Sequence, residues 1–235
     1  MKPILVVKLG STTPALAHRQ GDFEDWITAG LGVPPAQVAV ADPRQSPLPD
    51  PRQFAGVVLT GSHSMVTDHE AWSERTAQWI PAVVEANTPL LGICYGHQLI
   101  AYALGGEVGP NPSGRESGTV EITLRDEART DPLFAELPTV FAAHVSHAQS
   151  VLRLPPGAIW LAASRREPHH AFALGPRTWG VQFHPEFNEL AARTYVDACS
   201  GELRGQGDEP GQLQASIAAT PHAAAVLRRF GELAR

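Results

Sequence analysis

The stretch of the chain best suited to chemistry is Cys94, which stands between Gly92 and Gly96. An apolar run precedes the cysteine, and apolar residues at helical spacing follow it, which predicts a buried strand, a sharp turn and a helix. Glycines two residues either side of a nucleophile are typical of such a turn, because a Cβ would clash there. The dipole of the following helix favours the thiolate. We therefore interpret Cys94 as a nucleophile rather than as a buried structural cysteine.

A candidate base with a carboxylate partner occurs near the other end of the chain, in His184-Pro185-Glu186. His184 closes an apolar strand, and a chain that stays extended past Pro185 places Glu186 on the same side as His184. A carboxylate that holds one imidazole nitrogen leaves the other nitrogen to address a thiol. Alone, this tripeptide also fits a surface turn. Combined with Cys94, it predicts a cysteine, histidine and glutamate triad.

The elements that must position these residues alternate between strands and helices, which predicts one α/β domain. Strands are expected at residues 4–9, 37–41, 54–60, 89–93, 106–109, 117–124, 158–163, 171–174 and 178–183, and helices at 22–31, 70–85 and 223–233. Residues 139–145 and 151–152 are expected to frame a hairpin. Pro81 predicts a kink or an earlier end of its helix, and Gly201 is expected to stop a helix that follows Phe187.

Composition excludes several classes of protein. The net charge is −6 and only two lysines are present, so a nucleic-acid surface is not expected. Two cysteines cannot form a disulfide framework, and we interpret Cys199 as structural. His63 and His69 lack partners at ligand spacing, and His169-His170 is read as a polar strand start, so no metal is expected. Neither a signal peptide nor an apolar stretch of about 18 residues occurs, which predicts a cytoplasmic protein.

The two motifs together resemble those of the class I, or triad, glutamine amidotransferases, and in particular a free-standing domain of the GMP-synthase type. The resemblance extends over residues 5–187 and rests on Cys94-Tyr95-Gly96-His97-Gln98 and Gly180-Val181-Gln182-Phe183-His184-Pro185-Glu186. It implies a flavodoxin-like three-layer sandwich with a mostly parallel central sheet. We expect residues 1–187 to form the amidotransferase domain and residues 188–235 to form a helical extension packed on it.

The resemblance also implies an oxyanion hole, formed by the backbone N–H groups of Ser62 and Tyr95. Family members usually carry a second glycine and a proline where this chain has Ser62 and His63. Serine has the same backbone donor as glycine, provided that its φ and ψ suit a residue with a Cβ. The donor is therefore expected to persist.

Substrate-binding roles are implied for Gly61, Gln98, His147 and Ala148. The family commonly shows Ser-His-Gly-Asp where this chain has Ser-His-Ala-Gln at residues 146–149, and this departure bears on substrate choice. From the residues alone, His147 fits a hydrogen-bonded structural histidine better than a catalytic one. Residues 116–118 resemble a segment near the family's glutamine site, and no role is assigned to them.

Glutamine amide hydrolysis through a cysteine thioester is the function that the resemblance implies, with ammonia released for a separate synthase. The alternatives are a free-standing γ-glutamyl peptidase acting on small γ-glutamyl compounds, and a non-catalytic regulatory module. Expected ligands are glutamine or a γ-glutamyl small molecule. Neither a phosphate-binding loop nor a dinucleotide fingerprint is present, and we expect no cofactor. The net charge of −6 and the lack of a basic cluster predict neither nucleic-acid nor membrane partners.

Overall fold

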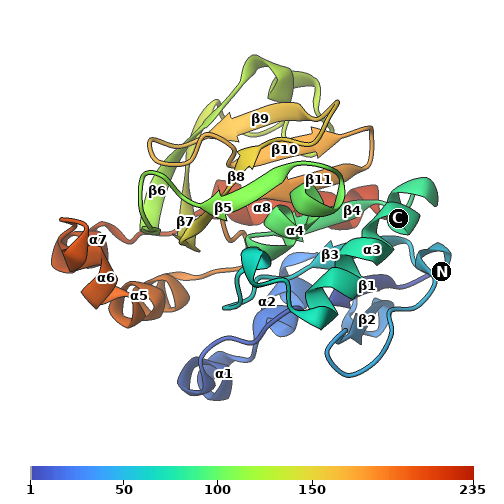
Figure 1. The fold of residues 1–235 in the computed structure, drawn as a ribbon, viewed down its shortest axis with the longest axis horizontal. Coiled ribbons are helices and arrows are strands. Elements are labelled where there is room, and N and C mark those ends of the chain that lie inside the picture. Colours follow the sequence, from blue (N-terminus) through green and yellow to red (C-terminus); the bar gives the residue numbers. More distant parts are fainter. Residues whose placement is uncertain (1) are drawn as a thin grey trace.

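The computed structural model describes residues 2–235 and contains a nine-stranded sheet with helices on both faces (Figure 1). The strands are β1 (Ile4–Val7), β2 (Val38–Ala41), β3 (Gly56–Leu59), β4 (Leu90–Ile93), β6 (Glu116–Leu124), β7 (Val140–His147), β9 (Ile159–Ala163), β10 (Ala171–Leu174) and β11 (Thr178–Val181). Their order is β2-β1-β3-β4-β11-β10-β9-β6-β7. The first five pair in parallel and the rest in antiparallel fashion.

Both faces of the parallel half are covered, which explains why its strands read as continuous apolar runs. Ile4 and Val6 join one core cluster with α2 (Phe23–Gly30) and α8 (Pro221–Leu233). Leu5 and Val7 join a second cluster with α3 (Ala71–Glu85) and α4 (Tyr95–Ala103). Successive side chains of a strand point to opposite faces, so each strand serves both clusters. The expected three-layer α/β sandwich with a mostly parallel central sheet is confirmed.

Two adjacent parallel strands carry the predicted triad. In β4 and β11, Gly92 is paired with Gly180 and Ile93 with Val181. The backbone N–H of Cys94 then donates to the carbonyl oxygen of Val181, at 2.8 Å. Because the carboxyl ends of parallel strands meet at one edge of a sheet, the segments that follow β4 and β11 emerge side by side.

Three short helices follow the triad segment: α5 (Glu189–Ala198), α6 (Ser200–Gly205) and α7 (Pro210–Ser216). They lie together at one end of the sheet, beside β6 and β7 (Figure 1). The expected stop at Gly201 is wrong, because α6 runs through this glycine and ends at Gly205. Helices α1 (Pro14–Gln20) and α7 were not predicted, and short 3₁₀ turns occur at Pro35–Gln37, Pro51–Gln53, Val66–Asp68 and Asp126–Thr130.

The expected hairpin around residues 144–149 is also wrong. Strand β7 pairs with β6 along its whole length, from His147 opposite Glu116 to Val140 opposite Thr123. The next strand, β8 (Gln149–Arg153), leaves this sheet and pairs with β5 (Glu107–Pro110) in a separate two-stranded sheet. The chain therefore changes sheets at Ala148.

Helix α3 continues past Pro81 and ends only at Glu85. Its buried face includes Trp72, Ile80 and Val83, and this packing holds the helix together across the missing N–H of the proline. Within residues 2–235, no helix has both the length and the apolar character required to cross a membrane.

Candidate active site

Cys94 occupies a strained turn between β4 and α4. Its φ of 51° and ψ of −101° lie in a region that residues with a Cβ rarely adopt. A Cβ on Gly92 would collide with the carbonyl oxygen of Gly96, and a Cβ on Gly96 would lie 2.5 Å from the carbonyl oxygen of Leu59. Close packing of the turn against its neighbours thus explains the two glycines that flank the cysteine.

His184 is held in one orientation by its neighbours. Its Nδ1 lies 2.7 Å from Oε1 of Glu186, and both side chains are buried. The ring of Phe187 stacks on the imidazole, with centroids 3.9 Å apart and planes inclined by 16°. The backbone N–H of His184 donates to the carbonyl oxygen of His144, at 2.8 Å. This arrangement leaves Nε2 of His184 for the thiol.

Cys94 and His184 shift each other's pKa. Burial alone would raise the pKa of the Cys94 thiol, but the charge and hydrogen bond of His184 lower it below its ordinary value. Burial alone would lower the pKa of His184, but the negative charges of Glu186 and of the Cys94 thiolate raise it to about 10. Both shifts therefore favour the thiolate and imidazolium over the neutral thiol and imidazole.

The loop after β3, which contains Gly61, lies beside Cys94 and His184. A Cβ on Gly61 would lie 3.2 Å from Cε1 of His184 and 3.9 Å from Cβ of Cys94. Among residues 2–235, no group accepts a hydrogen bond from the backbone N–H of Ser62 or of Tyr95. Ser62 has an ordinary negative φ, so its Cβ does not strain the loop. Ser62 and Tyr95 line the same cavity as Cys94, and their two N–H groups remain available as donors there.

A cavity of about 520 Å³ opens beside Cys94 and includes Ser62, Tyr95, Gln98, His147 and Ala148 in its lining. Of the residues expected to bind substrate, Gly61 contacts the triad rather than the cavity wall. The Gln98 amide nitrogen already donates to the carbonyl oxygen of Gln149 and to Oε1 of Gln182, at 3.0 and 2.9 Å. The side-chain oxygen of Gln98 is thus its remaining polar group.

The far wall of the cavity contains residues that sequence reasoning missed. Tyr195 and Cys199 lie one turn apart and line the cavity, with Arg115 and Glu202 beyond them. The Tyr195 hydroxyl lies 2.9 Å from Oγ1 of Thr12 and 3.0 Å from Nε2 of His63. The i, i+4 spacing of Tyr195 and Cys199 was the available signal for a shared face. Cys199, interpreted as structural, is also part of the cavity wall.

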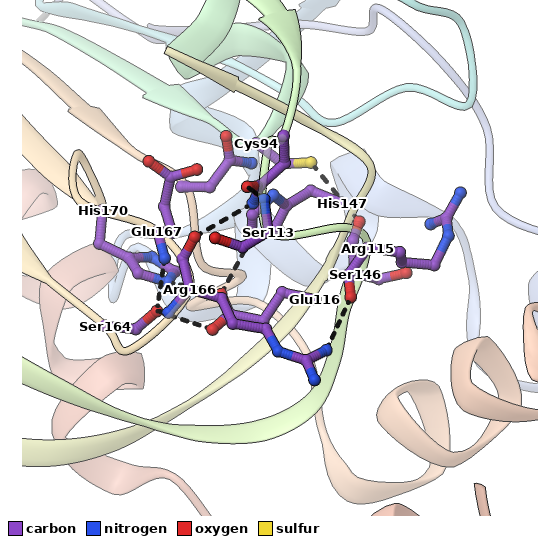
Figure 2. A network of polar contacts seen from close by, with 12 residues as sticks. Cys94, Ser113, Arg115, Glu116, Ser146, His147, Ser164, Arg166, Glu167 and His170 are labelled. Carbon is purple, nitrogen blue, oxygen red and sulfur yellow. Dashed lines mark hydrogen bonds and ion pairs between the residues drawn. The ribbon is translucent and has the colours of Figure 1, made fainter. Parts of the chain in front are cut away.

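A buried cluster adjoins the cavity below Cys94 (Figure 2). Oε2 of Glu116 lies 3.1 Å from Nε2 of His147 and 2.9 Å from Nε2 of His170. His169 and His170 directly precede β10, as expected, and His170 is completely buried. One nitrogen or oxygen atom from each of the three side chains lies within 4.8 Å of the others, and the hydrogen bonds of both imidazoles to Glu116 account for this spacing. The cluster is therefore described by its hydrogen bonds, and it does not include His63 or His69.

The family model and the most similar relatives that we compared point to the same protein family. The family described as glutamine amidotransferase class-I matches residues 25–196. GMP synthase (glutamine-hydrolyzing) of Aeropyrum pernix is 42% identical over 132 residues, which are 56% of this chain and 24% of that protein. A glutamine-hydrolyzing GMP synthase subunit of Ignicoccus hospitalis is 36% identical over 169 residues, covering 68% of this chain and 85% of that one.

Solved structures show the same fold. A glutamine amidotransferase from Thermotoga maritima superposes with a TM-score of 0.74 at 20% identity, covering 99% of this chain and 98% of that one. A glutamine amidotransferase from Methylobacillus flagellatus gives a TM-score of 0.72 at 24% identity, covering 100% and 92%. The chain spans about a quarter of the length of the GMP synthases it matches. Because the family match covers well over half of the chain, this protein belongs to the class-I glutamine amidotransferases.

Proposed function

We propose that this chain hydrolyses the side-chain amide of glutamine through a thioester on Cys94. The observation that carries the proposal is the Cys94 thiol at a strained turn, next to a His184 whose other nitrogen is held by Glu186 at 2.7 Å. A non-catalytic regulatory module would not require this arrangement, and it is the less favoured alternative.

The proposed reaction begins with attack of the Cys94 thiolate on the amide carbonyl carbon. The carbonyl oxygen becomes an oxyanion that accepts hydrogen bonds from the N–H groups of Ser62 and Tyr95. Nε2–H of His184 then gives its proton to the amide nitrogen, the carbon–nitrogen bond breaks and ammonia leaves.

Hydrolysis of the thioester completes the cycle. Neutral His184 takes a proton from water, and the hydroxide attacks the thioester carbon within the same oxyanion hole. The carbon–sulfur bond breaks, glutamate leaves and the thiolate–imidazolium pair is restored. Glu186 keeps Nδ1 of His184 protonated in both half-reactions, so that only Nε2 exchanges protons.

We propose that the released ammonia is transferred to a separate synthase. The relatives named as GMP synthases, one of them a single GMP synthase subunit of similar length to this chain, support it. We propose a synthase partner for this chain on that basis.

The second candidate activity is that of a γ-glutamyl peptidase, and the size of the cavity supports it. The cavity volume of about 520 Å³ is in the range of sites for drug-sized ligands, and the wall extends to Arg115 and Glu202. A γ-glutamyl compound with a larger leaving amine would use this space, whereas ammonia would not. Ala148 and Gln149, which differ from the family pattern, line the same cavity.

The test measures glutamate release from glutamine and from γ-glutamyl dipeptides, with the parent and with Cys94→Ala. We expect the parent to release glutamate and the variant to lose at least about 10³-fold in rate, because no other group in the mechanism can form the thioester. Ammonia released from glutamine favours the amidotransferase, and a higher kcat/KM on dipeptides favours the peptidase. Equal rates for parent and Cys94→Ala would refute both.

A further inference from the structure

The buried cluster of Glu116, His147 and His170 has no part in the mechanism above. Relative exposures of these residues are 4%, 3% and 0%. Glu116 receives hydrogen bonds from three directions, since the Ser164 hydroxyl donates to its Oε1 at 2.7 Å and the two imidazoles lie at its Oε2. Three converging donors favour a carboxylate over a carboxylic acid. Consistently, although burial would raise the pKa of Glu116, the hydrogen bonds from the two histidines lower it.

The hydrogen-bond partners of His147 determine its protonation. Nδ1 of His147 lies 3.0 Å from the carbonyl oxygen of Gln149, and Nε2 lies 3.1 Å from Oε2 of Glu116. Neither a carbonyl nor a carboxylate carries a hydrogen, so both ring nitrogens must donate. A neutral imidazole has only one N–H and would direct a lone pair at an oxygen. The hydrogen-bond count therefore requires an imidazolium, whereas His170 needs only one N–H to complete its contact with Glu116.

His147 also lies near the nucleophile. The Cys94 thiol contacts the carbonyl oxygen of Ser146 at 3.9 Å, and His147 and Cys94 line the same cavity (Figure 2). Titratable groups that act on His147 are the carboxylates of Glu116 and Glu167, the thiol of Cys94, and the rings of His170 and His97.

We propose that Glu116 and His170 hold His147 as a permanent cation, and that this second imidazolium supports the Cys94 thiolate together with His184. The inference rests on the proposed role of Cys94 as the nucleophile. It assigns different duties to the two rings. His184 gives its proton away in each turnover, whereas both N–H groups of His147 are engaged and its charge stays. His147, Glu116 and His170 are thus positioning residues.

The direction of the Glu116→Gln effect makes the proposal testable. If Glu116 acted only as a negative charge near the thiol, its removal would lower the pKa of Cys94. If Glu116 acts by keeping His147 charged, its removal neutralises the ring and the pKa of Cys94 rises. The two accounts predict opposite shifts.

The experiment measures the pH dependence of alkylation of Cys94 by iodoacetamide, resolved by mass spectrometry of the cysteine-containing peptides. Parent, Glu116→Gln, His147→Gln and His170→Asn are compared, with His169→Asn as a matched control on the neighbouring residue. Alkylation of Cys199 is followed separately in the same samples, because its Sγ contacts Ser117 next to Glu116, and His169→Asn serves as the control for general changes in thiol reactivity. No substrate is needed, so failure of the glutaminase assay and failure of this proposal are distinguishable.

We expect about a tenfold slower alkylation of Cys94 in Glu116→Gln and His147→Gln at a pH below the thiol pKa, corresponding to a rise of about one pKa unit. His170→Asn is expected to have a smaller effect, since asparagine also donates to Glu116, and His169→Asn none. If His147→Gln does not fold, the isosteric Glu116→Gln carries the test. Unchanged or faster alkylation in Glu116→Gln would overturn the proposal, as would one equivalent of tightly bound metal in the parent that this variant loses.

Discussion

Glu186→Gln is the substitution that probes the proposed triad most sharply. It keeps the size of the side chain and removes only its charge, 2.7 Å from Nδ1 of His184. A hydrogen bond to a charged group contributes about 1.5–3 kcal/mol, against about 0.5–1.5 kcal/mol for a neutral pair. The midpoints of these ranges differ by about 1.2 kcal/mol, which corresponds to about one pKa unit, or about tenfold in the protonation of His184.

The sign of the effect follows from the charge. The negative charge of Glu186 contributes to the pKa of about 10 for His184, so its removal lowers that pKa. The imidazolium must protonate the departing ammonia, and the alkaline limb of the kcat/KM profile should therefore move to lower pH. We expect kcat/KM for glutamine to fall at least about tenfold, and up to about 10⁴-fold if the new amide donates to Nδ1 and imposes the wrong tautomer.

The assay is ammonia release at subsaturating glutamine across the neutral and alkaline range. Thermal unfolding serves as the control. Oε2 of Glu186 is buried and has no hydrogen-bond partner among residues 2–235, so removing the charge also removes a desolvation cost that offsets the weaker hydrogen bond, and the melting temperature of the variant should fall by no more than a few degrees. An alkaline limb that stays in place, with kcat/KM undiminished, would show that Glu186 does not support His184.

Three further expectations concern stability. Gly92→Ala should cost about 3 kcal/mol in chemical denaturation, because its Cβ would collide with the carbonyl oxygen of Gly96; a cost near zero would contradict the close packing of the turn. Asp22→Ala should cost about 1–2 kcal/mol, since it removes the cap of α2 and the partner of Lys8, and unchanged stability would refute that role. The lowered pKa of Glu116 adds stability that is fully present above its ordinary value of about 4.5 and is lost as pH falls further. Glu116→Gln should therefore flatten the acid limb of the unfolding free energy, and an unchanged slope would contradict this.

The parts of the site that could be predicted depend on local signals. A Cβ on Gly92 would collide with the backbone of Gly96 only four residues later, so this part of the turn is visible in a short window, although Gly96 itself packs against the more distant Leu59. The contact between His184 and Glu186 also spans only two residues. Apolar runs identified most strands of the sheet because both of its faces are covered.

The parts that could not be predicted depend on pairings between distant segments. The hairpin prediction was wrong because β7 finds its partner in β6 rather than in β8, and both arrangements satisfy the same alternation of apolar residues. Glu116 and His170 are separated by 54 residues and meet only when the sheet is assembled. Their burial has no signature in either local segment.

The order of the strands has a consequence for folding of the chain during its synthesis on the ribosome. Strand β4, which precedes Cys94, is paired with β11, which precedes His184. Because His184 follows Cys94 by 90 residues, Cys94 leaves the exit tunnel well before His184 can contact it. The last helix, α8, packs against α2, and Phe230 and Ala234 lie close to Gly56. We propose that residues 1–187 and 188–235 therefore form one folding unit. The nascent chain therefore carries an unactivated thiol until β11 and His184 have left the exit tunnel.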